Sequence, residues 1–184
     1  MKKVFWVTLF LFAASFLACT HTGGVSRPTA YSFTIDLPEG WRKIENNRYL
    51  FVTKENSFEQ YIMVQNRPIS RPFRSTKKKI RKGMLPEEAA QVIIDDLVSD
   101  QNLVNLRILK NTPANVKGNK GFKILFVHGD SQGRTFKTLY YGFIKADTFF
   151  NLRFSASNQA LFQKDIQAFN FMLDSFQVVK AIKS

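Results

Sequence analysis

Polar and apolar residues alternate in short runs along most of the chain, and two longer stretches repeat their apolar residues at helical spacing. Alternation is typical of a strand with one buried face, because successive side chains point to opposite sides. Turn-forming residues separate the runs, which favours antiparallel pairing of neighbouring strands. Strands are predicted at 31–37, 48–53, 58–66, 104–110, 122–128, 135–145 and 149–155, with a short edge strand at 177–179.

Each stretch with helical periodicity follows a residue suited to begin a helix. Pro86 precedes two glutamates, and both features fit a first helical turn; this helix is expected to end near 100–102. Ser157 or Asn158 is expected to cap the second helix, which extends to about Phe176. The buried face of the second helix is predicted to contain Leu161, Ile166, Phe169 and Leu173.

Amphipathic strands and helices must bury one side each, so the pattern predicts a single α+β domain. We expect an antiparallel sheet of about seven strands packed with two main amphipathic helices. The domain is expected to occupy 31–184, which is long enough to bury a core without disulfides. Of the 19 Phe residues of the chain, four lie in the amino-terminal apolar run, and most of the others are expected to lie in that core.

The amino-terminal segment has a different pattern from the rest. Two lysines are followed by an uncharged apolar run that ends at Ala18, as in a secretory signal peptide. The run is shorter than the roughly 20 residues that a membrane span needs. Cys19 follows directly and is the only cysteine of the chain. Phe16-Leu17-Ala18-Cys19 resembles the lipobox of bacterial lipoproteins, although that family usually has Leu and then a small residue in the first two places.

This resemblance implies that Cys19 is acylated and becomes the new amino terminus. Residues 1–18 would then be a signal peptide, and residues 19–30 the lipidated cysteine and a polar, flexible tether. Thr20 stands where inner-membrane retention signals typically have Asp, which favours the outer membrane, facing the periplasm. Ordinary secretion with a cut nearby and a short uncleaved anchor are the alternatives.

The chain is strongly basic, with a formal charge of +13. This charge suits anionic lipids or envelope polymers, and export makes nucleic acid an unexpected partner. We define the basic segment as residues 71–82, which contain no acid. Its cations are Arg71, Arg74, Lys77, Lys78, Lys79, Arg81 and Lys82.

We expect the basic segment to contact an anionic surface, namely the membrane to which Cys19 is attached. Phe73 lies among the cations and is expected to insert its ring at the headgroup level. The alternative is pairing within the molecule. Acids are unfavourable at the negative end of a helix dipole. Nearby cations would therefore offset the unfavourable charge of the acids at the end of the first helix. These acids are Asp95, Asp96 and Asp100.

Few residues suggest chemistry. Gly129-Asp130-Ser131-Gln132-Gly133 matches the G-x-S-x-G of serine hydrolases, but that motif needs a following helix, whereas a strand is predicted here. A small serine hydrolase is therefore only an alternative. His128 is the only histidine of the domain, and no phosphate-binding loop occurs, so neither a metal nor a cofactor is expected. A carrier of an apolar ligand, held between helix and sheet, is a further alternative.

The start of the domain reads Phe33-x-Ile35-x-x-Pro38-x-Gly40-Trp41. This motif, at the head of an antiparallel α+β domain of this length, resembles the PsbP-like superfamily. Members of that group are mostly assembly factors or binding modules rather than enzymes with a shared site. This resemblance implies a binding or assembly module, and it transfers no catalytic or metal residue. Together with Cys19 and the lack of a catalytic constellation, it leads us to expect a non-enzymatic envelope lipoprotein that binds a protein or an anionic envelope component.

Overall fold

The structure is a computed structural model that describes residues 31–44, 49–54 and 58–180, and every structural statement below refers to these residues. The signal, Cys19 and the tether lie outside them. The two helices are α1 (Pro86–Val98) and α2 (Gln159–Ser175). The strands are β1 (Tyr31–Thr34), β2 (Trp41–Ile44), β3 (Leu50–Lys54), β4 (Gln60–Pro68), β5 (Val104–Val116), β6 (Asn119–Gly129), β7 (Thr135–Lys145), β8 (Thr148–Ala156) and β9 (Gln177–Lys180).

The strands form two sheets. The main sheet has seven strands in the order β2-β3-β4-β8-β7-β6-β5, and all its pairs are antiparallel. This confirms the predicted α+β class and the single domain, although the membership of the sheet differs from the prediction. β1 leaves the main sheet and pairs with β9, while the unpredicted β2 takes the edge position. β2 has only four residues, which are too few to show a clear alternation of polar and apolar positions.

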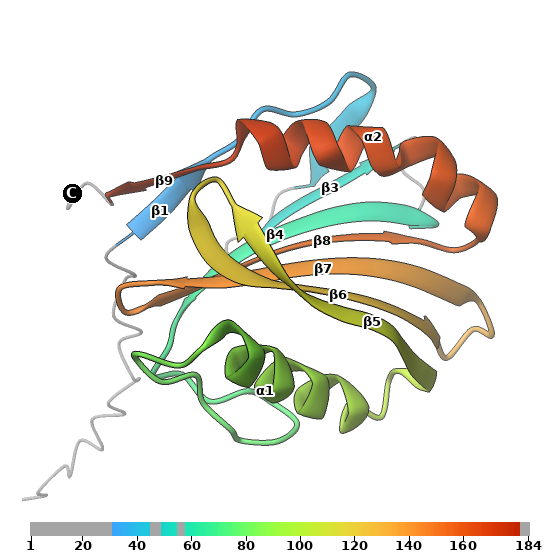
Figure 1. Ribbon diagram of the computed structural model, residues 1–184. Coiled ribbons are helices and arrows are strands. Elements are labelled where there is room, and N and C mark those ends of the chain that lie inside the picture. The colour runs from blue at the N-terminus through green and yellow to red at the C-terminus, as the bar shows by residue number, and fades with distance from the viewer. Residues whose placement is uncertain (1–30, 45–48, 55–57, 181–184) are drawn as a thin grey trace, which may run out of the picture.

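The two helices cover opposite faces of the main sheet (Figure 1). α1 packs on β5, β6 and β7, whereas α2 packs on β8 and β4. Alternation along the strands supplies a core for each helix. Phe122, Ile124 and Phe126 of β6 belong to the core beneath α1. Leu152 and Phe154 of β8 belong to the core beneath α2.

The buried face of α2 is centred differently from the prediction. Phe169 is fully buried, as predicted, but Leu161, Ile166 and Leu173 are only partly buried at the margins of the face. Apolar residues cover a wide part of the helix, so their spacing alone does not fix the centre. Asn158 caps the helix by accepting a hydrogen bond from the backbone N–H of Leu161 at 2.9 Å. The fully or nearly fully buried apolar residues of this face are Phe162, Phe169, Met172 and Phe176.

β5 is an edge strand of the main sheet and is longer than predicted. Its pairing with β6 is interrupted by register shifts between Val104 and Arg107 and between Ile108 and Lys110. Pro113 further removes one backbone donor. Such features blunt an edge against pairing with another chain. No helix in the described part of the chain is both long and apolar enough to span a bilayer.

Candidate functional site

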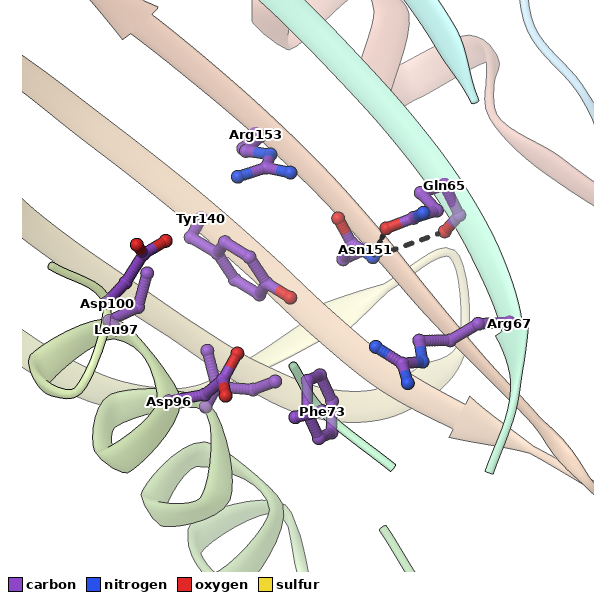
Figure 2. A pocket seen from close by; sticks show the side chains of 10 residues that line it. Gln65, Arg67, Phe73, Asp96, Leu97, Asp100, Tyr140, Asn151 and Arg153 are labelled. Carbon is purple, nitrogen blue, oxygen red and sulfur yellow. Dashed lines mark hydrogen bonds between the residues drawn. The ribbon is translucent and has the colours of Figure 1, made fainter. Parts of the chain in front are cut away.

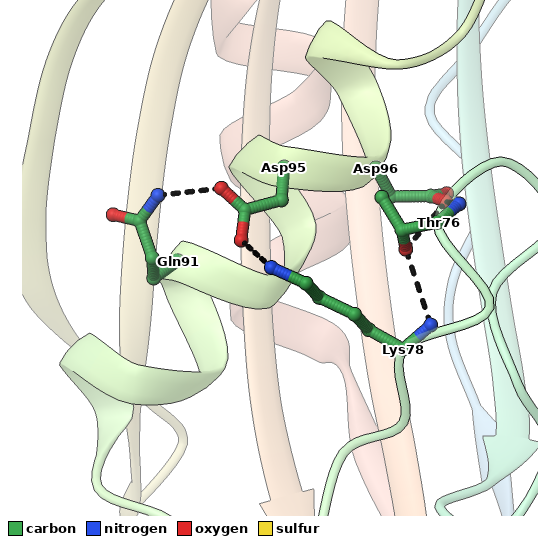
Figure 3. A network of polar contacts seen from close by, with 5 residues as sticks. All are labelled: Thr76, Lys78, Gln91, Asp95 and Asp96. Atoms are coloured by element: carbon green, nitrogen blue, oxygen red, sulfur yellow. Dashed lines mark hydrogen bonds and ion pairs between the residues drawn. The ribbon is translucent and has the colours of Figure 1, made fainter.

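The basic segment folds back on itself and lies against α1. The Asp96 side chain of α1 accepts hydrogen bonds from the backbone N–H groups of Ser75 and Thr76, each at 3.0 Å. The Thr76 hydroxyl donates to the same oxygen at 3.3 Å (Figure 3). Because hydrogen bonds to an ionised carboxylate are stronger than neutral ones, Asp96 fixes the backbone of the segment against the helix.

A second contact joins the basic segment to α1 through side chains. Lys78 Nζ lies 2.6 Å from Asp95 Oδ2, and Gln91 Nε2 donates to Asp95 Oδ1 at 2.7 Å (Figure 3). The hydrogen bond from Lys78, followed by that from Gln91, lowers the pKa of the Asp95 carboxyl. The Lys78 contact places positive charge beside Asp95, as the alternative of pairing within the molecule predicted. Asp96 instead meets backbone N–H groups and a hydroxyl rather than a cation. Asp100 instead accepts hydrogen bonds from Asn102.

Most cations of the basic segment remain exposed. Lys82 approaches Asp147 at 3.9 Å, but both side chains are largely in solvent, so this pair contributes little. Within the described ranges, five cations of the segment are exposed and form no ion pair. These five, which we call the free cations, are Arg71, Arg74, Lys77, Lys79 and Arg81.

The prediction that Phe73 inserts into a membrane is wrong. Its side chain is 7% exposed and packs edge-on against Phe149, with ring centroids 6.2 Å apart. The cause is the folding back of the segment: the N–H of Phe73 donates to the carbonyl of Lys78 at 2.8 Å, and that of Lys77 to the carbonyl of Phe73 at 3.1 Å. The ring therefore points into the core, and the Arg67 guanidinium lies 4.1 Å from its centroid.

A polar cavity of about 180 Å³, which we call the α1 cavity, lies between α1 and the main sheet (Figure 2). Burial, followed by the nearby charge of Arg71, lowers the pKa of the Arg67 guanidinium in its wall. Burial also raises the pKa of Tyr140, so its hydroxyl keeps its proton. The wall residues that carry polar groups include Gln65, Arg67, Asp96, Asp100, Tyr140, Asn151 and Arg153.

Sequence reasoning did not find this cavity, because its residues are distant along the chain. Gln65 of β4 pairs in register with Asn151 of β8, and Arg153 stands two residues further along the same face. One signal was available: Asn151 and Arg153 alternate with Phe150, Leu152 and Phe154 in β8. Polar residues at alternate positions of a strand buried on both faces indicate a polar patch inside the fold.

The G-x-S-x-G segment is a hairpin turn rather than a hydrolase site. β7 begins at Thr135, so a strand stands where a nucleophile elbow requires a helix. Asp130 shapes the turn by accepting hydrogen bonds from the backbone N–H groups of Gln132 and Arg134. His128 stacks on Phe136 with centroids 5.6 Å apart, and burial lowers the pKa of its imidazole.

The apolar-carrier alternative required an apolar cavity between helix and sheet. The α1 cavity has charged and amide groups in its walls, which suits a polar ligand instead. A separate hollow of about 210 Å³ lies at the first turn of α1, and its walls include the apolar residues Met84, Ala89 and Phe122.

Comparison with known proteins identifies the fold. No family model matches the chain, and no curated protein matches its sequence. Cyanobacterial PsbP (CyanoP) from Synechocystis sp. PCC 6803 is similar in structure, with a TM-score of 0.54 and 11% identity over 85% of this chain and 96% of that one. LpqN, described as involved in cell envelope biogenesis of Mycobacterium tuberculosis, has a TM-score of 0.54 and 12% identity over 83% and 86% of the two chains. The Ran-binding protein Mog1p of Saccharomyces cerevisiae has a TM-score of 0.51 and 16% identity over 80% and 90%.

The chain therefore has a PsbP-like fold, as its opening motif predicted. The residues of that motif build the fold. Phe33 stacks on Phe176 with centroids 5.6 Å apart, and the buried Trp41 packs edge-on against Phe154 at 6.4 Å. Gly40 has a φ of 75°, which suits glycine, in the turn before β2. Identities this low show the fold alone, so function must be argued from this chain's own surface.

Proposed function

We propose that the protein is a non-enzymatic binding module of the bacterial cell envelope, lipid-anchored through Cys19, that holds its basic segment against an anionic membrane surface. One observation carries this proposal: the free cations are exposed on a segment whose backbone Asp96 fixes to α1. A fixed array of cations loses less conformational freedom on binding than a flexible tail does. The outer membrane, facing the periplasm, is the proposed location.

The attraction of the free cations to an anionic leaflet holds the domain at the membrane only when the lipid anchor contributes as well. Each basic residue near an anionic leaflet contributes about 1 kcal/mol, and the attraction fades within a Debye length of about 8–10 Å. Residues 20–30 extend over at most about 35 Å, so a lipid on Cys19 keeps the domain near the bilayer. In Figure 1, the start of β1 and the loop that follows β4 both lie at the left of the view, which is compatible with one membrane-facing end.

Similar structures support a binding role rather than a catalytic one. LpqN is involved in cell envelope biogenesis of Mycobacterium tuberculosis, and Mog1p is a Ran-binding protein. Here they favour a module that acts by contact, since the only hydrolase motif is a hairpin turn. A protein partner on the basic segment is the competing outcome of the tests below.

Acylation is tested in cells that express the full chain. A fatty-acid analogue should label the protein, and Cys19→Ser should abolish the label and release the protein from membranes. A mature amino terminus downstream of Cys19, determined by mass spectrometry, would refute the anchor.

The membrane contact is tested by flotation with a soluble form that begins at Thr20. Both helices and all the strand pairs described lie within residues 31–180, so this form keeps the fold. It should float with anionic vesicles at low salt. It should not float with anionic vesicles at high salt or with neutral vesicles. A variant with Gln at all five free cations should lose this binding. The control removes equal charge from exposed positions elsewhere, namely Arg42, Arg107, Lys110, Lys120 and Lys164.

The control separates a defined surface from net charge. Loss of flotation in both variants would show attraction by overall charge alone. Absence of flotation for the unmodified form would refute the membrane contact, and capture of an envelope protein through the free cations would replace it by a protein partner.

A further inference from the structure

The α1 cavity carries opposite charges on opposite walls. Arg67 of β4 and Arg153 of β8 contribute cations from the sheet, whereas Asp96 and Asp100 contribute carboxylates from the helix side (Figure 2). Within the described part of the chain, no ion pair joins either arginine to either aspartate. The two charged groups thus face the same space without neutralising each other directly.

The arginine wall is held in place by neighbouring groups. Arg67 Nη2 donates to the carbonyls of Arg71 and Pro72 at 2.7 and 2.8 Å, which fixes the direction of the guanidinium. Arg153 Nη2 contacts Met63 Sδ at 2.9 Å.

Two buried polar atoms of the arginine wall have no hydrogen-bond partner among the described residues. Asn151 is 3% exposed, and its Oδ1 has no hydrogen-bond partner among the described residues. Arg153 Nε is likewise buried and without a partner among them. Buried polar groups are nearly always hydrogen-bonded to protein, water or a ligand, so these two atoms are available to a water or to a ligand group. Tyr140, which Figure 2 shows pointing toward the same space, adds a hydroxyl donor.

Apolar side chains complete the enclosure. Phe73, Ile93 and Leu97 line the cavity between the charged walls. Its volume of about 180 Å³ corresponds to roughly six water molecules at liquid density. A ligand that fits this space has one small anionic group, one small cationic group and a short apolar part.

We propose that the α1 cavity binds a small zwitterion, a free α-amino acid, whose carboxylate meets Arg67 and Arg153 and whose ammonium meets Asp96 and Asp100. The Tyr140 hydroxyl donates to the carboxylate, and the unpartnered Asn151 Oδ1, which is an acceptor, accepts a hydrogen bond from the ammonium. Phe73, Ile93 and Leu97 contact an aliphatic side chain. None of the free cations lines the cavity, although Phe73 belongs to the basic segment and Asp96 also holds that segment against α1.

The charge arrangement favours a zwitterion over a singly charged ligand. A carboxylate alone would satisfy the arginines but leave the aspartates unpaired, and an amine alone would do the reverse. Charges removed from water are costly unless they are paired. A ligand that pairs with the arginines and with the aspartates therefore binds better than a ligand that carries only one of the two charged groups.

The test uses the form that begins at Thr20 and the common free L-amino acids, measured by calorimetry and by NMR. L-leucine is compared with 4-methylpentanoate, which lacks the ammonium, and with isopentylamine, which lacks the carboxylate. At least one aliphatic amino acid should bind saturably, at least tenfold more tightly than both analogues. The Arg153 Nε–H signal should shift on binding, which a merely structural change elsewhere would not produce.

Two variants remove one charge from each wall without touching the hydrogen bonds that fix the basic segment. Arg153→Gln and Asp100→Asn should each weaken the binding at least tenfold. The matched controls Arg107→Gln and Asp174→Asn, at exposed positions of β5 and α2, should leave it unchanged. Absence of saturable binding of any amino acid at 10 mM would mean a water-filled polar cavity only and would overturn the proposal. Binding of 4-methylpentanoate as tight as that of L-leucine, or binding unaffected by both variants, would overturn it as well.

Discussion

Truncation of Phe169 to alanine tests the packing of α2 against the main sheet. The ring is fully buried, and its centroid lies 6.0 Å from that of Phe154 and 5.9 Å from that of Tyr141. Burying a Phe side chain contributes about 1.5–3 kcal/mol, and the cavity left after truncation adds to the loss. Phe169→Ala should therefore lower the free energy of unfolding by about 3–5 kcal/mol.

Phe171→Ala is the matched control on the same helix, because the Phe171 side chain is 50% exposed. It should change the free energy of unfolding by less than about 1 kcal/mol, since little burial is lost and alanine favours the helix. Urea unfolding followed by circular dichroism measures both. At a urea dependence of about 2 kcal/mol per M, Phe169→Ala should lower the midpoint by about 1.5–2.5 M. Equal effects of the two substitutions would refute the orientation of α2.

Three further perturbations test other parts of the structure. Burial lowers the pKa of His128, so the unfolded chain binds a proton near pH 6.5 whereas the folded protein does so only at lower pH. Stability should therefore fall as the pH drops below about 6.5, and His128→Phe should weaken this fall in urea titrations across the pH range. Gly142→Ala would place its Cβ against the ring of Phe122 and should cost about 1–3 kcal/mol; an unchanged urea midpoint would contradict this close approach. Asp96→Asn should cost about 1–2 kcal/mol and should speed hydrogen exchange at Ser75 and Thr76 more than elsewhere. Unchanged exchange at these two amides would contradict the role of Asp96.

Local patterns predicted the elements of the fold well. Alternation located the strands of the main sheet except β2, and Pro86 and Asn158 mark the beginnings of the two helices as predicted. The turn between β6 and β7 was also predicted, because alternation resumes after Gly133. These features depend on residues that are neighbours in the sequence, so they can be predicted from a single sequence.

Long-range features were not predictable in the same way. The direction of Phe73 depends on how the basic segment folds back over α1, and no local pattern records this. The α1 cavity requires β4 beside β8, and Gln65 and Asn151 are 86 positions apart in the sequence. The sequence indicated the charge of the basic segment and of the following helix, but not that Asp96 would bind backbone N–H groups.

The pairing of β1 with β9 has a consequence for the order in which the protein forms. Tyr31 stands opposite Lys180, so the small sheet joins the two ends of the described chain. A chain that emerges amino terminus first cannot complete this sheet until its final strand is available, and β4 must likewise wait for β8. Topologies dominated by such distant pairings fold in about milliseconds to seconds, more slowly than helical bundles. The pairings of β1 with β9 and of β4 with β8 thus form only after most of the chain has been synthesised, whereas the β5–β6 and β6–β7 hairpins can form earlier.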